Sequence, residues 1–569
     1  MRGKAIGRIR FLTAALLLVA VILIGRLYQV QIMHGADYKE RGEAQYVHTV
    51  QDLYDRGSIF FTTKDGEEVS AATVQSGFLL AIDPTRINDA EATYEALNSV
   101  YPLEKARFME RAGRINRSYQ EIATRVSRSD ADAIEELGLK GVMLYRNQWR
   151  YYPGESLGAR TVGFVGYSGN ELSGRYGIER YYDDVLSRDN ERLSVNFFAE
   201  IFSNLGTVVF DSSDSREGDV ITTIEPTVMR NLERELLATN ETWNSSFTGG
   251  IIMNPKTGEI VGLGMVPSFD LNDRSGVDIA DFRNPLVEDV YEFGSIIKAL
   301  TVAAGLDSGA ITPATTYYDS GSIELDTFTI SNFDGKGRGY VPMQEVLSQS
   351  LNTGVAFIVT EMGKAAFREY FLNLKLGSET GIDLPNETYG LVNNLNSPRD
   401  VEYATASFGQ GIALTPVAAT RALATLGNGG TLPSPHIVKE IRYEDGTVQP
   451  ISYPEGERVF SEETSEEVSR MLVEVVDEAL KGGDVKLENY TVGAKTGTAQ
   501  IADRENGGYY EDRFLHSFFG YFPAYDPEFI VFLYTVEPKE VRYASETLTD
   551  PFMNITKFLI NYYNIPPDR

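Results

Sequence analysis

Residues 291–305 read YEFGSIIKALTVAAG, and this stretch predicts a helix that is apolar on nearly every side. Such a helix is buried in the core of a large domain. Ser295 stands at its N-terminus, where free backbone N–H groups favour developing negative charge. Lys298 follows three residues later, about one turn along the same face. We therefore expect the two side chains to lie together at one end of a buried helix.

A lysine inside an apolar helix is costly while it is charged. Desolvation lowers the pKa of a buried amine, and a neutral Lys298 can take the proton of the Ser295 hydroxyl. The alternative is a capping serine beside a lysine that extends its amine to solvent. The spacing S-x-x-K occurs once in 569 residues. The segment alone leaves both interpretations open.

A second segment carries polar groups that fit the same chemistry. Residues 344–353 (QEVLSQSLNT) present the hydroxyl of Ser350 and the amide of Asn352 on one side of a turn or helix start. The pattern S-x-N recurs at residues 168–170 and 194–196. A capping role is therefore the alternative for this pair.

A third segment, residues 493–498 (GAKTGT), opens a predicted strand with small side chains. Gly497 lets a ligand come close to the strand backbone. Lys495 can attract a carboxylate, and Thr498 can hydrogen-bond it. K-T-G also occurs at residues 256–258, but there it lies in a predicted hairpin turn.

The amino-acid composition limits the kinds of reaction and partner that this protein can have. The 569 residues include 42% hydrophobic side chains, which is enough for several cored domains and excludes a disordered polyelectrolyte. Lys and Arg number 52 against 81 Asp and Glu, so the net charge of −29 disfavours nucleic acid as a partner. The absence of cysteine excludes a thiol nucleophile, and the 4 histidines lack metal-ligand spacing. We expect no metal and no cofactor.

The N-terminus predicts a membrane anchor. Residues 1–10 are basic without an acid, and residues 11–25 carry no charge. An uncharged helix of that length spans about 22 Å of a ~30 Å hydrocarbon core, so the anchor is extended to residue 33. A cleaved signal peptide is the alternative, although no small-x-small site follows. We expect residues 1–10 in the cytoplasm and a single-pass anchor at 11–33, with the rest of the chain outside the cytoplasm.

The exported part divides at residues 211–219 (DSSDSREGD), a polar stretch between two regions of apolar patterning. Residues 34–215 are expected to form an elongated α+β module with a modest core. Residues 216–569 are expected to form a larger body with a helix that starts at Pro226 and ends near residue 238. Antiparallel hairpins follow, the first at residues 250–265.

The order of the motifs carries a family resemblance. S-x-x-K at Ser295, S-x-N at Ser350 and K-T-G-T at Lys495 follow one another as in the class B penicillin-binding proteins, which are monofunctional peptidoglycan transpeptidases. Further segments resemble the same family: residues 56–59 (RGSI), 176–179 (YGIE), 267–270 (PSFD), 380–385 (TGIDLP), 407–416 (SFGQGIALTP) and 518–523 (FFGYFP). This chain departs from the pattern at Phe293, where proline is usual, and at Ile296, where threonine is common.

The resemblance implies an α+β multidomain fold with a transmembrane helix, an elongated pedestal or dimerisation domain, and a transpeptidase domain whose antiparallel sheet packs between helices. It implies catalytic roles for Ser295, Lys298, Ser350, Asn352 and Lys495, and substrate binding by Thr496, Gly497 and Thr498. In that scheme Ser295 attacks the penultimate D-Ala carbonyl and Lys298 is the general base. Ser350 relays a proton, and Asn352 holds Lys298 and the substrate amide.

The same resemblance implies the partners. These are peptidoglycan stem peptides, β-lactams that acylate Ser295, a membrane glycan polymerase with other wall-synthesis or division proteins, and a second copy of the chain. Duty at the division septum is expected rather than in the lateral wall. The alternatives are a D,D-carboxypeptidase or β-lactamase, or a non-catalytic scaffold or β-lactam sensor.

Overall fold

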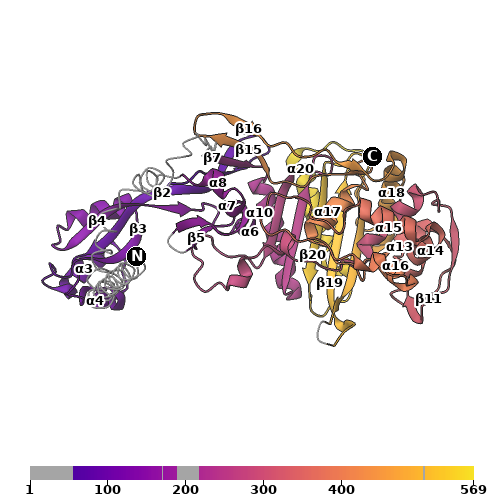
Figure 1. The fold of residues 1–569 in the computed structure, drawn as a ribbon, viewed down its shortest axis with the longest axis horizontal. Helices are drawn as coiled ribbons and strands as arrows, with labels where there is room; N and C mark the ends of the chain where they lie inside the picture. The colour runs from indigo at the N-terminus through magenta and orange to yellow at the C-terminus, as the bar shows by residue number, and fades with distance from the viewer. Residues whose placement is uncertain (1–54, 169–170, 189–216, 504–505) are drawn as a thin grey trace, which may run out of the picture. The chain divides into compact units, whose positions relative to one another are not determined.

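The computed structural model describes residues 55–168, 171–188, 217–503 and 506–569. The predicted cytoplasmic tail and anchor, residues 1–33, lie outside the described residues. Within the described ranges, no helix combines the length and the apolar character needed to cross a membrane. Contacts divide the chain into a smaller unit around Val74–Arg150 and a larger unit (Figure 1). The larger unit comprises Arg56–Thr73, Tyr151–Arg188 and the described part of Val208–Arg569. The boundary between residues 215 and 216 stays a prediction.

The smaller unit is a small α+β body. The second half of β2 lies between β3 and β4. Its elements are β2 (Glu68–Ile82), α3 (Ala90–Val100), α4 (Lys105–Ala112), β3 (Gln120–Val126), α5 (Arg128–Glu136) and β4 (Val142–Tyr151). Leu80, Leu97 and Phe108 are buried in a core of its own. The expectation of a modest core for this region agrees with that small cluster.

The larger unit is built around a five-stranded antiparallel sheet in the order β18-β19-β20-β8-β9 (Figure 1). Its strands are β8 (Phe247–Met253), β9 (Ile260–Val266), β18 (Gly493–Ala502), β19 (Tyr509–Phe522) and β20 (Phe529–Val536). The hairpin expected at residues 250–265 is β8 with β9, which confirms that prediction. β18, the strand with the K-T-G-T segment, stands at one edge of this sheet.

Helices cover both faces of this sheet. α10 (Pro226–Trp243) and α20 (Thr549–Tyr563) pack on one face, where Leu533 is buried. α12 (Lys298–Asp307) and α17 (Pro416–Ala424) belong to the cluster on the other face, where Phe532 is buried. Neighbouring residues of a strand point to opposite faces, so β20, which is buried along its whole length, contributes to both cores. The expected sheet packed between helices is confirmed.

A second sheet in the larger unit joins distant segments of the chain. Its order is β16-β15-β7-β1, followed by the first half of β2. The strands are β1 (Ile59–Thr62), β7 (Gly218–Thr222), β15 (Val438–Tyr443) and β16 (Val448–Pro450). Beside it, the buried guanidinium of Arg56 pairs with Glu179 at 2.7 Å. The segments RGSI and YGIE are thus held together by one buried ion pair.

The remaining elements surround these sheets. Near residues 151–188 lie α6 (Ala159–Val162), β5 (Val165–Ser168), β6 (Glu171–Gly174), α7 (Gly177–Tyr181) and α8 (Asp183–Leu186). The middle of the chain adds the 3₁₀ turn η3 (Ile279–Phe282), α11 (Pro285–Glu288), the 3₁₀ turn η4 (Gly294–Ile297), β10 (Thr316–Asp319), β11 (Ser322–Leu325), β12 (Phe328–Ser331), β13 (Gly339–Pro342), α13 (Met343–Ser348), α14 (Asn352–Met362), α15 (Lys364–Asn373), η5 (Asn393–Asn396) and α16 (Asp400–Ala406). The last part adds β14 (Thr431–Leu432), β17 (Glu457–Arg458), α18 (Glu462–Glu474), the π turn η6 (Val475–Ala479), η7 (Leu480–Gly483) and α19 (Ala544–Thr547).

Candidate active site

Ser295 lies in the 3₁₀ turn η4, directly before α12. Residues i and i+3 eclipse one another in a 3₁₀ turn, which brings Lys298 onto the same side as Ser295. Gly294 adopts φ +66, and a Cβ there would lie 2.9 Å from the carbonyl oxygen of Thr498. Glycine is therefore required at this position for the Ser295 turn to pack against β18.

Phe293, the departure from the family pattern, is a buried aromatic anchor. Its ring meets Phe532 edge-on at a centroid distance of 5.1 Å and lies 6.0 Å from the ring of Tyr534. The other departure, Ile296, is also fully buried. Both side chains fix the Ser295 turn to the core by apolar packing.

Lys298 is fully buried, and its ammonium group is held by one residue. Its Nζ donates to the carbonyl oxygen of Ser350 at 2.6 Å and to the hydroxyl of Ser350 at 3.1 Å. Burial, reinforced by the nearby charge of Lys495, lowers the pKa of Lys298 well below its usual value. A spectator lysine reaching for solvent is thereby excluded, because this side chain points inward.

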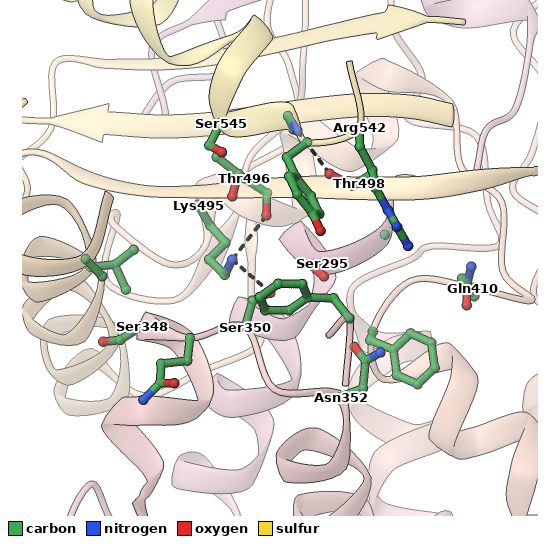
Figure 2. Close-up of a pocket in the computed structure, with 18 of the residues that line it drawn as sticks. Ser295, Ser348, Ser350, Asn352, Gln410, Lys495, Thr496, Thr498, Arg542 and Ser545 are labelled. Carbon is green, nitrogen blue, oxygen red and sulfur yellow. Dashed lines mark hydrogen bonds between the residues drawn. The ribbon is translucent and has the colours of Figure 1, made fainter. Parts of the chain in front are cut away.

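Ser350 stands in the turn between α13 and α14, in the left-handed region at φ +55. Its hydroxyl accepts a second hydrogen bond, from Lys495 Nζ at 3.1 Å (Figure 2). Two lysine amines, one from α12 and one from β18, therefore converge on a single hydroxyl. An unusual backbone conformation at such a point is typical of a functional site.

Lys495 is buried on β18, where its Nζ also donates to the carbonyl oxygen of Thr496 at 3.1 Å. Burial lowers the pKa of Lys495 to about 8. The hydroxyl of Thr498 accepts a hydrogen bond from the backbone N–H of Ala544 at 3.1 Å.

These groups border a cavity of about 730 Å³. Six of the eight residues expected in the site line it: Ser295, Ser350, Asn352, Lys495, Thr496 and Thr498 (Figure 2). Its wall contains the cations Arg338, Lys481, Lys495 and Arg542 and no aspartate or glutamate among the described residues. In a chain with a net charge of −29, a cavity wall that carries cations and no acid favours an anionic ligand, above all beside Lys495 and Arg542, which make no ion pair within the described residues.

Lys298 and Gly497 are the two expected residues that do not line the cavity, and Asn352 lines it without the expected bond to Lys298. Gly497 does not line the cavity; a Cβ there would lie 2.4 Å from the Phe293 carbonyl oxygen and 2.4 Å from Ser517 Oγ. Its role is close packing of β18 against the Ser295 turn. The amide of Asn352 donates to the carbonyl oxygen of Ser331 at 2.8 Å, whereas the amine of Lys298 donates to Ser350.

Residues outside the three sequence motifs form a second wall of the cavity. Residues 542–545, which precede and begin α19, bring Arg542 and Tyr543 to the rim, and residues 329–338 bring Phe333. The rings of Phe333 and Tyr543 meet at a centroid distance of 5.9 Å. These segments carry no family motif. The only signal in the sequence is a pair of adjacent cationic and aromatic side chains in a loop after a buried strand.

No cluster of potential metal ligands occurs among the described residues. The arrangement supplies instead a serine hydroxyl on a tight turn, a desolvated amine within one turn of it, and a second hydroxyl shared by two amines. This combination can activate a serine for attack on a carbonyl carbon.

The comparisons with known proteins agree with this geometry. The family model described as "Penicillin binding protein transpeptidase domain" matches residues 248–557, and that of the "Penicillin-binding Protein dimerisation domain" matches residues 55–197. Stage V sporulation protein D of Bacillus subtilis is 30% identical over 99% of this chain and 86% of its own length. Peptidoglycan D,D-transpeptidase FtsI of Escherichia coli is 26% identical over 99% of this chain and 92% of its own length.

The solved structure of penicillin-binding protein 2X from Streptococcus thermophilus has the same fold. It superimposes with a TM-score of 0.71 at 20% identity, covering 90% of this chain and 81% of that one. The transpeptidase model alone matches more than half of the chain. The protein therefore belongs to the class B penicillin-binding proteins, with a dimerisation domain followed by a transpeptidase domain.

Proposed function

We propose that this protein cross-links peptidoglycan stem peptides as a serine D,D-transpeptidase, with Ser295 as its nucleophile. The observation that carries the proposal is the convergence of Lys298 and Lys495 on the hydroxyl of Ser350, in a cavity that Ser295 lines. The names of the relatives, which include several peptidoglycan D,D-transpeptidases, support the same reaction.

The hydrogen bonds of Lys298 support its role as general base. A neutral amine has two N–H donors and one lone pair. The carbonyl and the hydroxyl of Ser350 take both donors. The lone pair is then left for the proton of Ser295, and no hydrogen bond within the described residues ties that hydroxyl elsewhere. Burial lowers the pKa of Lys298, which favours the neutral amine that can accept this proton.

Acylation then proceeds in two steps. Ser295 Oγ bonds to the carbonyl carbon of the penultimate D-Ala while its proton passes to Lys298. The bond from that carbon to the nitrogen of the terminal D-Ala breaks, and the nitrogen takes a proton through the Ser350 hydroxyl. The products are an ester on Ser295 and free D-Ala, and the lysine returns to its neutral form.

Deacylation repeats these steps in reverse order with a new amine. The amine of a second stem peptide attacks the ester carbon and gives up a proton through Ser350 and Lys298. The Ser295 oxygen leaves as the hydroxyl, and the new amide is the cross-link. Backbone N–H groups of Ser295 and Thr498 would hold the oxyanion, and one such donor contributes about 3 kcal/mol.

The acid-free wall of the cavity supports recognition of the donor's terminal carboxylate by Lys495, Thr496 and Thr498. The penicillin carboxylate occupies the same position in this scheme, so β-lactams acylate Ser295. Asn352 would orient the substrate amide from its place on the cavity wall. Gly497 serves the site by packing rather than by contact with substrate.

The cellular setting is part of the same proposal. Residues 1–10 would lie in the cytoplasm, residues 11–33 would anchor the chain in the plasma membrane, and residues 34–215 and 216–569 would form the pedestal and the transpeptidase domain outside the cytoplasm. We infer a role in cell division, in company with a membrane glycan polymerase, from relatives named FtsI. A second copy of the chain is a further partner, since the dimerisation-domain model matches residues 55–197.

The test is a reconstituted cross-linking assay with the full chain in detergent and a purified glycan polymerase supplying nascent strands. Digested products are separated by mass. We expect cross-linked dimers together with released D-Ala, and neither product from Ser295→Ala. Release of D-Ala without dimers would identify a carboxypeptidase instead. Absence of both, with no covalent penicillin label, would identify a scaffold.

A further inference from the structure

Two of the four cations in the wall of the cavity, Lys495 and Arg542, make no ion pair within the described residues. Arg338 pairs with Asp334 at 2.7 Å, and Lys481 pairs with Asp550 at 2.6 Å. Within the described residues, the guanidinium of Arg542 makes no ion pair. Its guanidinium carbon lies over the ring of Tyr543, 5.8 Å from the ring centroid. The other cations of the wall are already neutralised or buried, so Arg542 has its donors available for a ligand.

The backbone around Arg542 is fastened to the K-T-G-T strand. His516, the cross-strand partner of Thr498, contacts the carbonyl oxygen of Arg542 through Nε2 at 3.0 Å and the hydroxyl of Thr547 through Nδ1 at 3.0 Å. Burial lowers the pKa of His516 to about 4, so the neutral ring donates from Nε2 and accepts at Nδ1. The N–H of Ala544 adds the bond to Thr498.

These bonds place the Arg542 side chain beside Thr498. Figure 2 shows the Arg542 side chain extending from its loop past Thr498, while Thr496 lies on the other side of Thr498, next to Lys495; all of these residues line the cavity. A guanidinium so placed can meet a carboxylate held by the two threonine hydroxyls. A planar guanidinium binds a carboxylate through two parallel hydrogen bonds, which an ammonium cannot do.

The other cation near those hydroxyls is committed elsewhere. Lys495 Nζ already donates to Ser350 Oγ and to the carbonyl oxygen of Thr496. Burial also lowers its pKa to about 8, so its charge is partly lost in mildly alkaline solution. A guanidinium keeps its charge under the same conditions. Arg542 would therefore keep a positive charge near the donor's carboxylate at a pH where Lys495 loses part of its own.

We infer that Arg542 is a specificity-determining residue that pairs with the terminal carboxylate of the acyl donor, beside the hydroxyls of Thr496 and Thr498. The inference rests on the proposed function and names how that site distinguishes donors with a terminal carboxylate from donors without one.

The test compares two small acyl donors on the full chain in detergent: an N-acyl-D-alanyl thioglycolate, which has a terminal carboxylate, and the matching thioglycolamide, which has none. Arg542→Gln should lower kcat/KM for the carboxylate donor by about 10- to 100-fold, as expected for a lost charge-assisted hydrogen bond. It should leave kcat/KM for the amide donor within about threefold. Arg542→Lys should restore part of the preference.

Arg338→Gln is the matched control, because it also removes one positive charge from the wall of the cavity but from an arginine that already has an acidic partner. It should keep the preference for the carboxylate donor. A second readout is pH: between about pH 7 and about pH 9.5 the wild type should retain a larger share of its preference than Arg542→Gln, because Lys495 loses its proton over this range and only the wild type still has the guanidinium of Arg542.

Equal losses with both donors in Arg542→Gln, or an equal loss of preference in both variants, would overturn the inference. Failure of the proposed function would look different, since the wild-type chain would then turn over neither donor.

Discussion

Lys298 directs its amine to Ser350 twice, to the carbonyl oxygen at 2.6 Å and to the hydroxyl at 3.1 Å. The pair joins the N-terminus of α12 to the turn before α14, segments more than fifty positions apart in the chain. Both N–H donors of a neutral amine are satisfied by this one residue. The arrangement fixes the amine inside the core and leaves its lone pair as the reactive group.

The amine of Lys298 can be removed without burying a new charge. Lys298→Met keeps nearly the same shape, so the free energy of unfolding should not fall, because a desolvated amine is itself costly. Acylation by a fluorescent penicillin should slow by at least about 10³-fold, the contribution of a general base to a nucleophile that is otherwise protonated. Stopped-flow labelling measures the rate, and thermal unfolding checks the fold.

The control is Lys256→Met in the other K-T-G segment, where the lysine is part-exposed and pairs with Asp526. It should label at the wild-type rate. A Lys298→Met rate within tenfold of wild type would refute the assignment of the base.

Lys298 and Lys495 should give rise to opposite limbs of the pH profile of acylation. Burial and the charge of Lys495 lower the pKa of Lys298, so the rising limb, which follows deprotonation of the base, lies below the ordinary lysine range. The pKa of Lys495 is about 8, and the loss of its charge above that pH weakens the attraction for the carboxylate. The second-order rate constant for penicillin acylation should therefore fall through about pH 8. A flat profile up to about pH 10, close to the ordinary lysine pKa, would contradict this.

Ser350 allows its hydroxyl and its backbone to be tested separately. Ser350→Gly and Ser350→Ala both remove the shared hydroxyl, so both should slow acylation by about 10²-fold or more. Only alanine is strained at φ +55, so its free energy of unfolding should be about 1 kcal/mol lower than that of the glycine variant. Denaturant unfolding measures the difference. Equal stability of the two variants would argue against a left-handed Ser350.

Gly497 should be essential although it touches no ligand. A Cβ at Gly497 meets the Phe293 carbonyl oxygen and Ser517 Oγ at 2.4 Å each, so Gly497→Ala must push β18 away from the Ser295 turn. We expect a loss of acylation of about 10²-fold, since small misplacements of catalytic groups are costly. Gly262→Ala on β9 is the matched control, because its nearest neighbour would be an ordinary contact at 3.4 Å. Wild-type labelling by Gly497→Ala would show that the close approach is dispensable.

The elements that bear the central motifs could be predicted from the sequence. The apolar periodicity after Ser295 predicts a buried helix, and α12 is buried along nearly its whole length. The small residues around Lys495 predict a strand, and β18 covers them. Both are local patterns, and local patterns report the backbone well.

The end of α10 was predicted less well. The sequence suggests an end near residue 238, but the helix continues to Trp243 and closes at Asn244 with φ 44. The last turns are polar in sequence, so their periodicity is weak. Thr239 is nevertheless buried there, which shows that tertiary packing extends the helix.

The second wall of the cavity could not be predicted. Phe333, Arg542 and Tyr543 lie in loops without a motif, and their position depends on the pairing of β19 with β18 and on the contacts of His516. The sequence also did not show that Gly497 packs against the Ser295 turn while its neighbours in K-T-G-T line the cavity. Only the distance of a Gly497 Cβ from the Phe293 carbonyl separates a packing role from a binding role.

The most direct test of the whole account is the site of covalent modification. The full chain is treated with benzylpenicillin, digested, and its peptides are mapped by tandem mass spectrometry. The account predicts one penicilloyl group per chain, on Ser295, absent from Ser295→Ala and present in Thr496→Ala at a reduced rate. A penicilloyl group on Ser350 or elsewhere, or persistent labelling of Ser295→Ala, would contradict it.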